Sequence, residues 1–143
     1  MLWVTRHEPH VDRCASAWLI RNFIDKEAVF EFISKESPIP KGAIAFTLPR
    51  AEIGPTEGKS TTFDALVERY RVSDPIVAKI QRLLHDFEIT AKEDIAKVKY
   101  PETAGICLVL RGIARTSRTD HETITKATTV MDALYAELKA RSK

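Results

Sequence analysis

Residues 3–25, WVTRHEPHVDRCASAWLIRNFID, run from a short alternating segment into a stretch that is apolar at nearly every helical position. The alternation over residues 2–6 predicts a β-strand, and the spacing that follows predicts a helix. Phe and β-branched residues at 29–33 and 43–48 predict two further strands. The order strand, helix, strand favours a right-handed crossover with parallel pairing.

The remainder of the chain predicts helices. Residues 49–62, PRAEIGPTEGKSTT, form a predicted loop, and helical spacing covers 60–70, 74–87, 101–117 and 120–139. Gly105 and Gly112 lie on one stripe, and we expect them to let another backbone pack closely. We therefore predict one α+β domain over residues 1–143. It has a small, partly parallel three-stranded sheet near the N-terminus and about five to six helices.

Charge and cysteine content exclude several classes of protein. The 22 basic and 20 acidic side chains give a net charge of +2, which argues against bulk binding of nucleic acid. No nucleic-acid-binding region is expected in this chain. Cys14 and Cys107 form neither a disulfide framework nor a C-x-x-C zinc pair, and we expect them in the core. Without a signal peptide or a membrane-spanning stretch, the predicted location is cytoplasmic, away from membranes.

Three arginines occur in the opening stretch. Arg21 falls among apolar helical positions, so it is expected to be at least half buried and to need a carboxylate or an anion. Arg6 is expected near the end of the first strand. Arg13 is expected in the first helical turn, where free backbone N–H groups attract oxyanions. Asp12 is the expected N-cap. The predicted anion-binding site consists of Arg6, Asp12, Arg13 and Arg21.

Acidic side chains offer an alternative to an external anion. Arg21 would then pair internally with Asp25 or Glu52, and the other two arginines would be solvated. The loop at 49–62 is expected to be mobile and to cover a cleft bordered by acids. Carboxylates in this cleft are expected to neutralise the arginines rather than to bind a metal. The predicted cleft residues are Glu52, Asp64, His121 and Glu122.

The segment HDFE at 85–88 has the composition of a site for a hard divalent ion. A continuous helix would place His85 opposite the apolar stripe and Asp86 well off it. A solvated face is therefore the favoured interpretation, unless the helix breaks near Asp86. Thr119 and Glu122 are spaced as a capping box at the start of the last helix. The candidate metal ligands are Asp86, Glu88 and His121.

Several short motifs occur in the order and spacing of one known family. They are WVTR at 3–6, Pro9, VDR at 11–13, WLIRNFID at 18–25, FEF at 30–32, Glu52, Gly54, FDAL at 63–66, Asp74-Pro75, PETAGI at 101–106, DHE at 120–122 and DALYA at 132–136. With these motifs the chain resembles the C-terminal domain of the chromate-resistance regulator family, ChrB. The resemblance spans nearly the whole chain and implies a chromate-linked protein. It also implies that full-length members carry a separate N-terminal DNA-binding region.

The chain departs from the family pattern where the resemblance leads us to expect cysteine and histidine. Ser16 stands in place of one cysteine, Pro55 or Thr56 in place of a histidine, and Thr61 or Thr62 in place of a second cysteine. If this Cys, Cys and His set binds a soft metal or performs redox chemistry in relatives, this chain lacks it.

Three classes of function follow from the sequence. The first is a stand-alone ChrB-like domain that binds or senses a small oxyanion such as chromate, sulfate or phosphate. The second is a metal-dependent enzyme that requires a divalent metal as cofactor. The third is a structural or homo-oligomer-forming domain built on the long apolar helices. No nucleophile with an adjacent base is evident, so the binding domain ranks above the enzyme. The residues of the enzyme alternative are Glu52, Asp64, Asp86 and His121.

Overall fold

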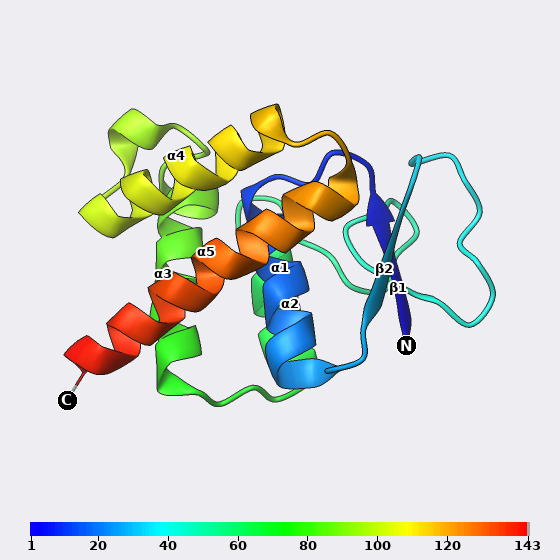
Figure 1. Cartoon of the computed structure of the whole chain (residues 1–143), viewed down its shortest axis with the longest axis horizontal. Coiled ribbons are helices and arrows are strands. Elements are labelled where there is room, and N and C mark those ends of the chain that lie inside the picture. The colour runs from blue at the N-terminus through cyan, green and yellow to red at the C-terminus, as the bar shows by residue number, and fades with distance from the viewer. Residues whose placement is uncertain (143) are drawn as a thin grey trace.

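The computed structural model describes residues 1–142 and places a small sheet beside a larger group of helices (Figure 1). The strands are β1 (Leu2–Arg6), β2 (Val29–Ile33) and β3 (Ile44–Ala45). Their order is β2-β1-β3, and both pairs are parallel. The predicted α+β class and crossover are therefore confirmed. The third strand is shorter than predicted because Thr47 has a positive φ of 54°, which ends the extended backbone.

Five α-helices follow the chain order, and shorter helical turns extend two of them. α5 crosses α1 and α3, while α1 also packs against α2 (Figure 1). The α-helices are α1 (Val11–Leu19), α2 (Thr62–Arg69), α3 (Pro75–His85), α4 (Pro101–Thr116) and α5 (Asp120–Arg141). The π-helical turns are η1 (Ile20–Ile24) and η2 (Asp86–Thr90), and η3 (Ile95–Lys97) is a 3-10 turn.

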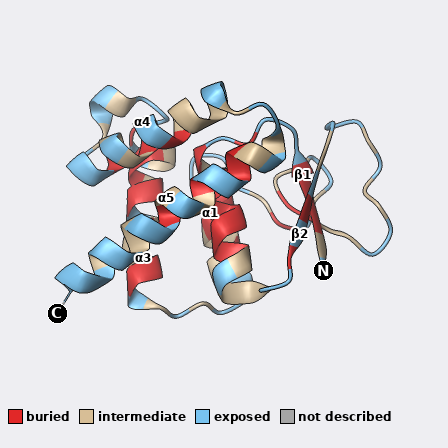
Figure 2. Cartoon of the chain, in the orientation of Figure 1, coloured by how far each residue is buried: buried red, intermediate tan, exposed pale blue. Residues whose placement is uncertain are grey.

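Helix α1 lies at the centre of the core, as its all-round apolar sequence predicts. Figure 2 shows it buried along most of its length. Its Trp18 is 1% exposed, and the indole N–H donates to the Asp132 carboxylate at 2.9 Å. Cys14 and Cys107 are buried free thiols, which confirms the expectation that they belong to the core. Burial raises the pKa of both thiols to about 12.

Helix α3 changes to the π-helical turn η2 directly after His85. Asp86 and Phe87, at the start of this wider turn, are buried at 3% and 1% exposure. The expected solvated face is therefore wrong for Asp86. Its carboxylate accepts hydrogen bonds from the backbone N–H groups of Lys99 and Tyr100 at 2.8 and 2.9 Å. Asp86 thus fastens the segment that leads into α4.

Helix α4 turns one apolar face to solvent. A Cβ added at Gly105 or at Gly112 would meet nothing within 4 Å. Leu108 and Val109, between them, are 58% and 49% exposed. The prediction that these glycines admit a close backbone is wrong within this chain, because α1 and α5 pack against the opposite face. None of the helices in residues 1–142 combines the length and apolarity needed to cross a bilayer.

Candidate functional site

The connection between β1 and α1 is held from the side by the start of α5. The Asp120 carboxylate lies 2.9 Å from His7 Nδ1 and accepts a hydrogen bond from the backbone N–H of Glu8 at 3.1 Å. Glu8 itself adopts a positive φ of 61°, which is uncommon for a residue with a side chain. The connection therefore has a fixed and locally strained backbone.

Arg13 also holds the connection between β1 and α1. Its guanidinium donates to the backbone carbonyl oxygens of Arg6, of His7 at 3.3 Å and of Glu8 at 2.6 Å. Burial lowers the pKa of Arg13, because desolvation disfavours its charged form. The Arg6 side chain, in contrast, is exposed. Of these two predicted anion ligands, Arg13 already satisfies its donors within the protein.

Helix α1 begins at Val11 without a side-chain cap. Its N-cap residue is His10, whose side chain accepts no hydrogen bond from the helix. The prediction that Asp12 caps α1 is wrong, because α1 begins one residue earlier and Asp12 faces α2. The Asp12 carboxylate accepts from the backbone N–H groups of Thr62 at 2.8 Å and Phe63 at 3.2 Å. Burial raises the pKa of Asp12, and these hydrogen bonds oppose the rise.

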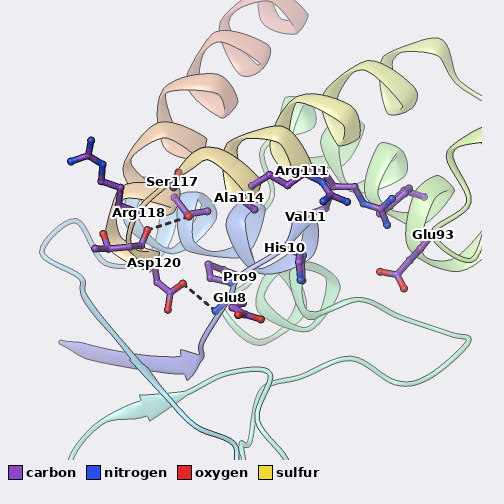
Figure 3. Close-up of a pocket in the computed structure, with 14 residues that line it drawn as sticks. Glu8, Pro9, His10, Val11, Glu93, Arg111, Ala114, Ser117, Arg118 and Asp120 are labelled. Atoms are coloured by element: carbon purple, nitrogen blue, oxygen red, sulfur yellow. Dashed lines mark hydrogen bonds between the residues drawn. The ribbon is translucent and has the colours of Figure 1, made fainter.

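A cavity of about 880 Å³, here called the α4 cleft, opens between this uncapped end and α4 (Figure 3). Arg111 and Arg115 line it from one side of α4, one helical turn apart. In Figure 3, Arg118 lies near Asp120 and extends away from Arg111. The α4 cleft is lined by Glu8, Pro9, His10, Val11, Phe87, Glu93, Arg111, Ala114, Arg115, Ser117, Arg118, Thr119, Asp120 and Thr123.

Among the charged groups that line the α4 cleft, Asp120 has partners within the protein, whereas two arginines have no carboxylate partner in the described chain. Asp120 is engaged by His7 and by the backbone of Glu8. Within residues 1–142, neither Arg111 nor Arg115 has a carboxylate oxygen within 4.0 Å. The Arg111 guanidinium instead lies 5.0 Å from the centre of the Phe87 ring. Two guanidinium charges therefore face the cleft without an anionic partner.

A second cavity of about 310 Å³, the acid cavity, shares His10 and Glu93 with the α4 cleft. Asp12 and Glu88 also line it. Burial is the main cause that raises the pKa of Glu88 to about 8, and the negative charges of Asp12 and Glu93 add to it. A hydrogen bond with Glu93 acts in the same direction, while Arg111 opposes it. Glu88 is therefore mostly protonated at neutral pH.

Strained backbone marks both cavities. Among residues 1–142, five residues other than glycine have positive φ, and three of these, Glu8, Thr47 and Glu93, line the α4 cleft or the acid cavity. Such conformations cost about 1–3 kcal/mol each and occur preferentially at functional sites. Their positions agree with a site built around the start of α1.

Arg21 is partly buried, as predicted, but its partner differs from the predictions. Its guanidinium lies 5.0 Å from the centre of the Phe30 ring and donates to the carbonyl oxygen of Ala28 at 3.2 Å. Within the described chain no carboxylate lies within 4.0 Å of it, so the expected pairing with Asp25 or Glu52 is wrong. Asp25 instead binds the Trp3 indole and the N-terminal amine, whereas Glu52 pairs with an arginine of α2 at 2.9 Å. An aromatic face and a carbonyl suffice for a half-buried guanidinium.

The remaining predicted cleft residues engage different parts of the fold. Asp64 of α2 contacts His85 of α3, whereas the His121 ring packs edge-on against Phe32 of β2 at 5.1 Å. Glu122 pairs with a lysine of α5 at 2.9 Å.

The predicted capping box at the start of α5 is confirmed in half. Thr119 accepts from the Glu122 N–H at 3.1 Å, while the Glu122 carboxylate accepts from the N–H of Arg118 at 2.8 Å rather than from that of Thr119. Across residues 1–142, no group of three or more His, Cys, Asp or Glu side chains is placed to hold a metal ion. This holds for the candidate ligands Asp86, Glu88 and His121 as well.

Sequence reasoning missed four residues of the site, His10, Glu93, Arg111 and Arg115. Two signals for them were visible. Arg111 and Arg115 are four residues apart at the end of a predicted helix, and His10 occupies a position where Ser, Thr, Asp or Asn would cap the next one. Glu93 carried no signal, because only the turn after η2 brings it to the cleft.

The family model described as ChrB, C-terminal domain, matches residues 3–138. Over 142 residues, 99% of this chain and 42% of the relative, the chain is 28% identical to Protein ChrB of Cupriavidus metallidurans. The chain thus spans less than half the length of that relative. No solved structure matches it. Because the family model covers nearly the whole sequence, as the motifs predicted, the chain belongs to the ChrB C-terminal domain family.

Proposed function

We propose that the α4 cleft binds a small oxyanion such as chromate, sulfate or phosphate. One observation carries this proposal: the uncapped start of α1 and the unpaired arginines Arg111 and Arg115 face the same cavity. Free N–H groups at a helix N-terminus favour anions, and guanidinium groups form strong, directed hydrogen bonds to oxyanions. The predicted loop between β1 and α1 therefore keeps its proposed role, with the arginines supplied by α4.

Three acids line the α4 cleft beside the arginines: Glu8, Glu93 and Asp120. Asp120 already has a histidine and a backbone N–H as partners. Glu88, whose pKa is raised to about 8, holds a proton at neutral pH and adds little negative charge. In this proposal Arg13 is a positioning residue, because it fixes the carbonyl groups of the connection that leads into the open start of α1.

The burial and raised pKa of the two thiols favour binding of the anion rather than its reduction by cysteine. A cysteine reacts as the thiolate, and a pKa of about 12 leaves almost none of Cys14 or Cys107 in this form at neutral pH. Both side chains are also buried. The family resemblance links the domain to chromate resistance, so a binding or sensing role for chromate is the first choice among the oxyanions.

Isothermal titration with sulfate, phosphate and chromate tests the proposal. Arg115→Gln is expected to weaken binding about tenfold, because one charge-assisted hydrogen bond is lost. Arg71→Gln is the matched control, since it removes the same charge from an exposed residue that lines neither cavity. Equal affinities for the wild type and both variants, or no binding of any of the three anions, would contradict the proposal.

A further inference from the structure

A third cavity, of about 520 Å³, lies between α3, η2 and the segment before α4. We call it the α3 cavity. It shares no lining residue with the α4 cleft or the acid cavity. Its volume is within the range of cavities that hold organic ligands. It is lined by Ala78, Gln81, Arg82, His85, Asp86, Thr90, Lys99 and Tyr100.

The charge available to a ligand in the α3 cavity is positive. Arg82 and Lys99 line it and are exposed, and within residues 1–142 neither has a carboxylate oxygen within 4.0 Å. Asp86 is the only acid among its lining residues. Both oxygens of this carboxylate accept backbone hydrogen bonds, so its charge is compensated inside the protein. Burial acts to raise the pKa of Asp86, but these bonds lower it overall.

His85 is held in the α3 cavity by a fixed carboxylate. Its Nε2 contacts the Asp64 side chain, which comes from α2 and is 12% exposed. Asp64 in turn accepts from the backbone N–H of Thr61 at 2.9 Å and from Gln81 Nε2 at 2.6 Å. An imidazole oriented by a carboxylate keeps one ring nitrogen for another partner. Nδ1 of His85 is that nitrogen, and it has no partner among the described residues.

One wall of the α3 cavity suits a ring. Tyr100 lines it, with Lys99 Nζ 5.6 Å from the ring centre, and Ala78 adds apolar surface. An aromatic face beside cationic groups accommodates a planar ring that carries an anionic substituent.

We propose that the α3 cavity binds an organic phosphate, with Arg82, Lys99 and His85 Nδ1 directed at the phosphate and Tyr100 against its organic part. Arginine and lysine are the usual side chains for phosphate. In its imidazolium form the ring adds an Nδ1–H donor whose direction is fixed by Asp64. This site is independent of the oxyanion proposed for the α4 cleft.

Phenyl phosphate is a suitable probe, followed by NMR of the histidine and tyrosine side chains. His85→Gln identifies the His85 signal, and His10 reports on the α4 cleft. We expect saturable shifts of His85 and Tyr100 that are about tenfold weaker in affinity for Arg82→Gln and for Lys99→Gln. Lys79→Gln, on the same helix but outside the cavity, is the control and should match the wild type.

Three outcomes overturn the proposal. They are the absence of shifts at His85, shifts at His10 alone, and equal shifts with inorganic phosphate at the same concentration. Because Arg82 and Lys99 are exposed, their variants are expected to fold, and a loss of the shifts in a folded variant supports the site. Failure of the oxyanion titrations in the α4 cleft would leave this result unaffected.

Discussion

The start of α1 differs from the starts of α2, α3 and α5. Side chains of Thr61, Asp74 and Thr119 accept hydrogen bonds from the first turns of those three helices, whereas His10 provides none to α1. Caps of this kind stabilise a helix by about 1 kcal/mol. Helix α4 also starts without a side-chain cap, at Tyr100, but the start of α1 is the open end that faces the α4 cleft and is surrounded by strained backbone. The start of α1 therefore lacks the stabilisation of a cap, and a bound anion would accept hydrogen bonds from its free N–H groups.

The largest expected loss of stability comes from removing Asp12, whose carboxylate is a second acceptor at the start of α2. Asp12→Ala leaves the N–H groups of Thr62 and Phe63 without their buried partner, so the free energy of unfolding should fall by about 3 kcal/mol. Asp12→Asn retains one oxygen acceptor and should lose about 1 kcal/mol. Urea unfolding measures both changes. A loss below about 0.5 kcal/mol for Asp12→Ala would show that α2 does not depend on this contact.

A pH titration examines the acids beside the open helix end. The pKa of Glu88 is raised from 4.5 to about 8, so the folded state holds a proton that the unfolded chain releases. Stability should therefore decrease as pH rises from about 4.5 to about 8, by an amount on the order of 2 kcal/mol. Glu88→Gln should remove this decrease, when unfolding by urea is measured at pH 5 and pH 8.

Glu57→Gln is the matched control for that titration, because Glu57 lines the same acid cavity from the exposed loop. It should keep the pH dependence of the wild type. Identical pH dependence in wild type and Glu88→Gln would mean that the buried carboxyl group is not responsible.

The two arginines next to the open end should differ in their effects. Arg13→Ala removes donors to the carbonyl groups of Arg6, His7 and Glu8, and should cost about 1.5 kcal/mol. Arg13→Lys should restore little, because an ammonium group cannot reproduce the planar fork. Arg6→Ala changes an exposed side chain and should alter stability by less than about 0.5 kcal/mol. Thermal unfolding that ranks Arg6 above Arg13 would contradict this assignment.

The fold was predictable where the signal is local. The alternation at 2–6, the strand pattern at 29–33 and the Asp74-Pro75 start of α3 depend on neighbouring residues only, and all three are confirmed. The change to π-helical turns after Leu19 and after His85 was not predictable, because an apolar helical pattern does not distinguish the two geometries.

Most of the site was not predictable, because its contacts join residues far apart in the sequence. Asp12 has the sequence features of an N-cap of its own helix, but it binds N–H groups 50 and 51 residues away. The contact between Asp64 and His85 spans 21 residues and depends on how α2 and α3 pack. The sequence predicted an anion site at the loop before α1, and this stays a prediction. The identity of the arginines depended on the position of α4.

A modest gain in stability gives the sharpest test of the comparison. His10→Asp supplies the missing cap of α1, so its side chain should accept from the first turn and raise the free energy of unfolding by about 0.5–1 kcal/mol. The same carboxylate would occupy the N–H groups proposed for the oxyanion and repel it, so titration with sulfate should show at least tenfold weaker binding. Asp74→Ala is the control, since it removes an existing cap from α3, whose start does not line the α4 cleft, and should lower stability by about 1–2 kcal/mol without this loss of affinity. A His10→Asp variant that is more stable and still binds sulfate as the wild type does would separate the open helix end from anion binding. Greater stability together with lost binding would show that α1 is left uncapped for the ligand.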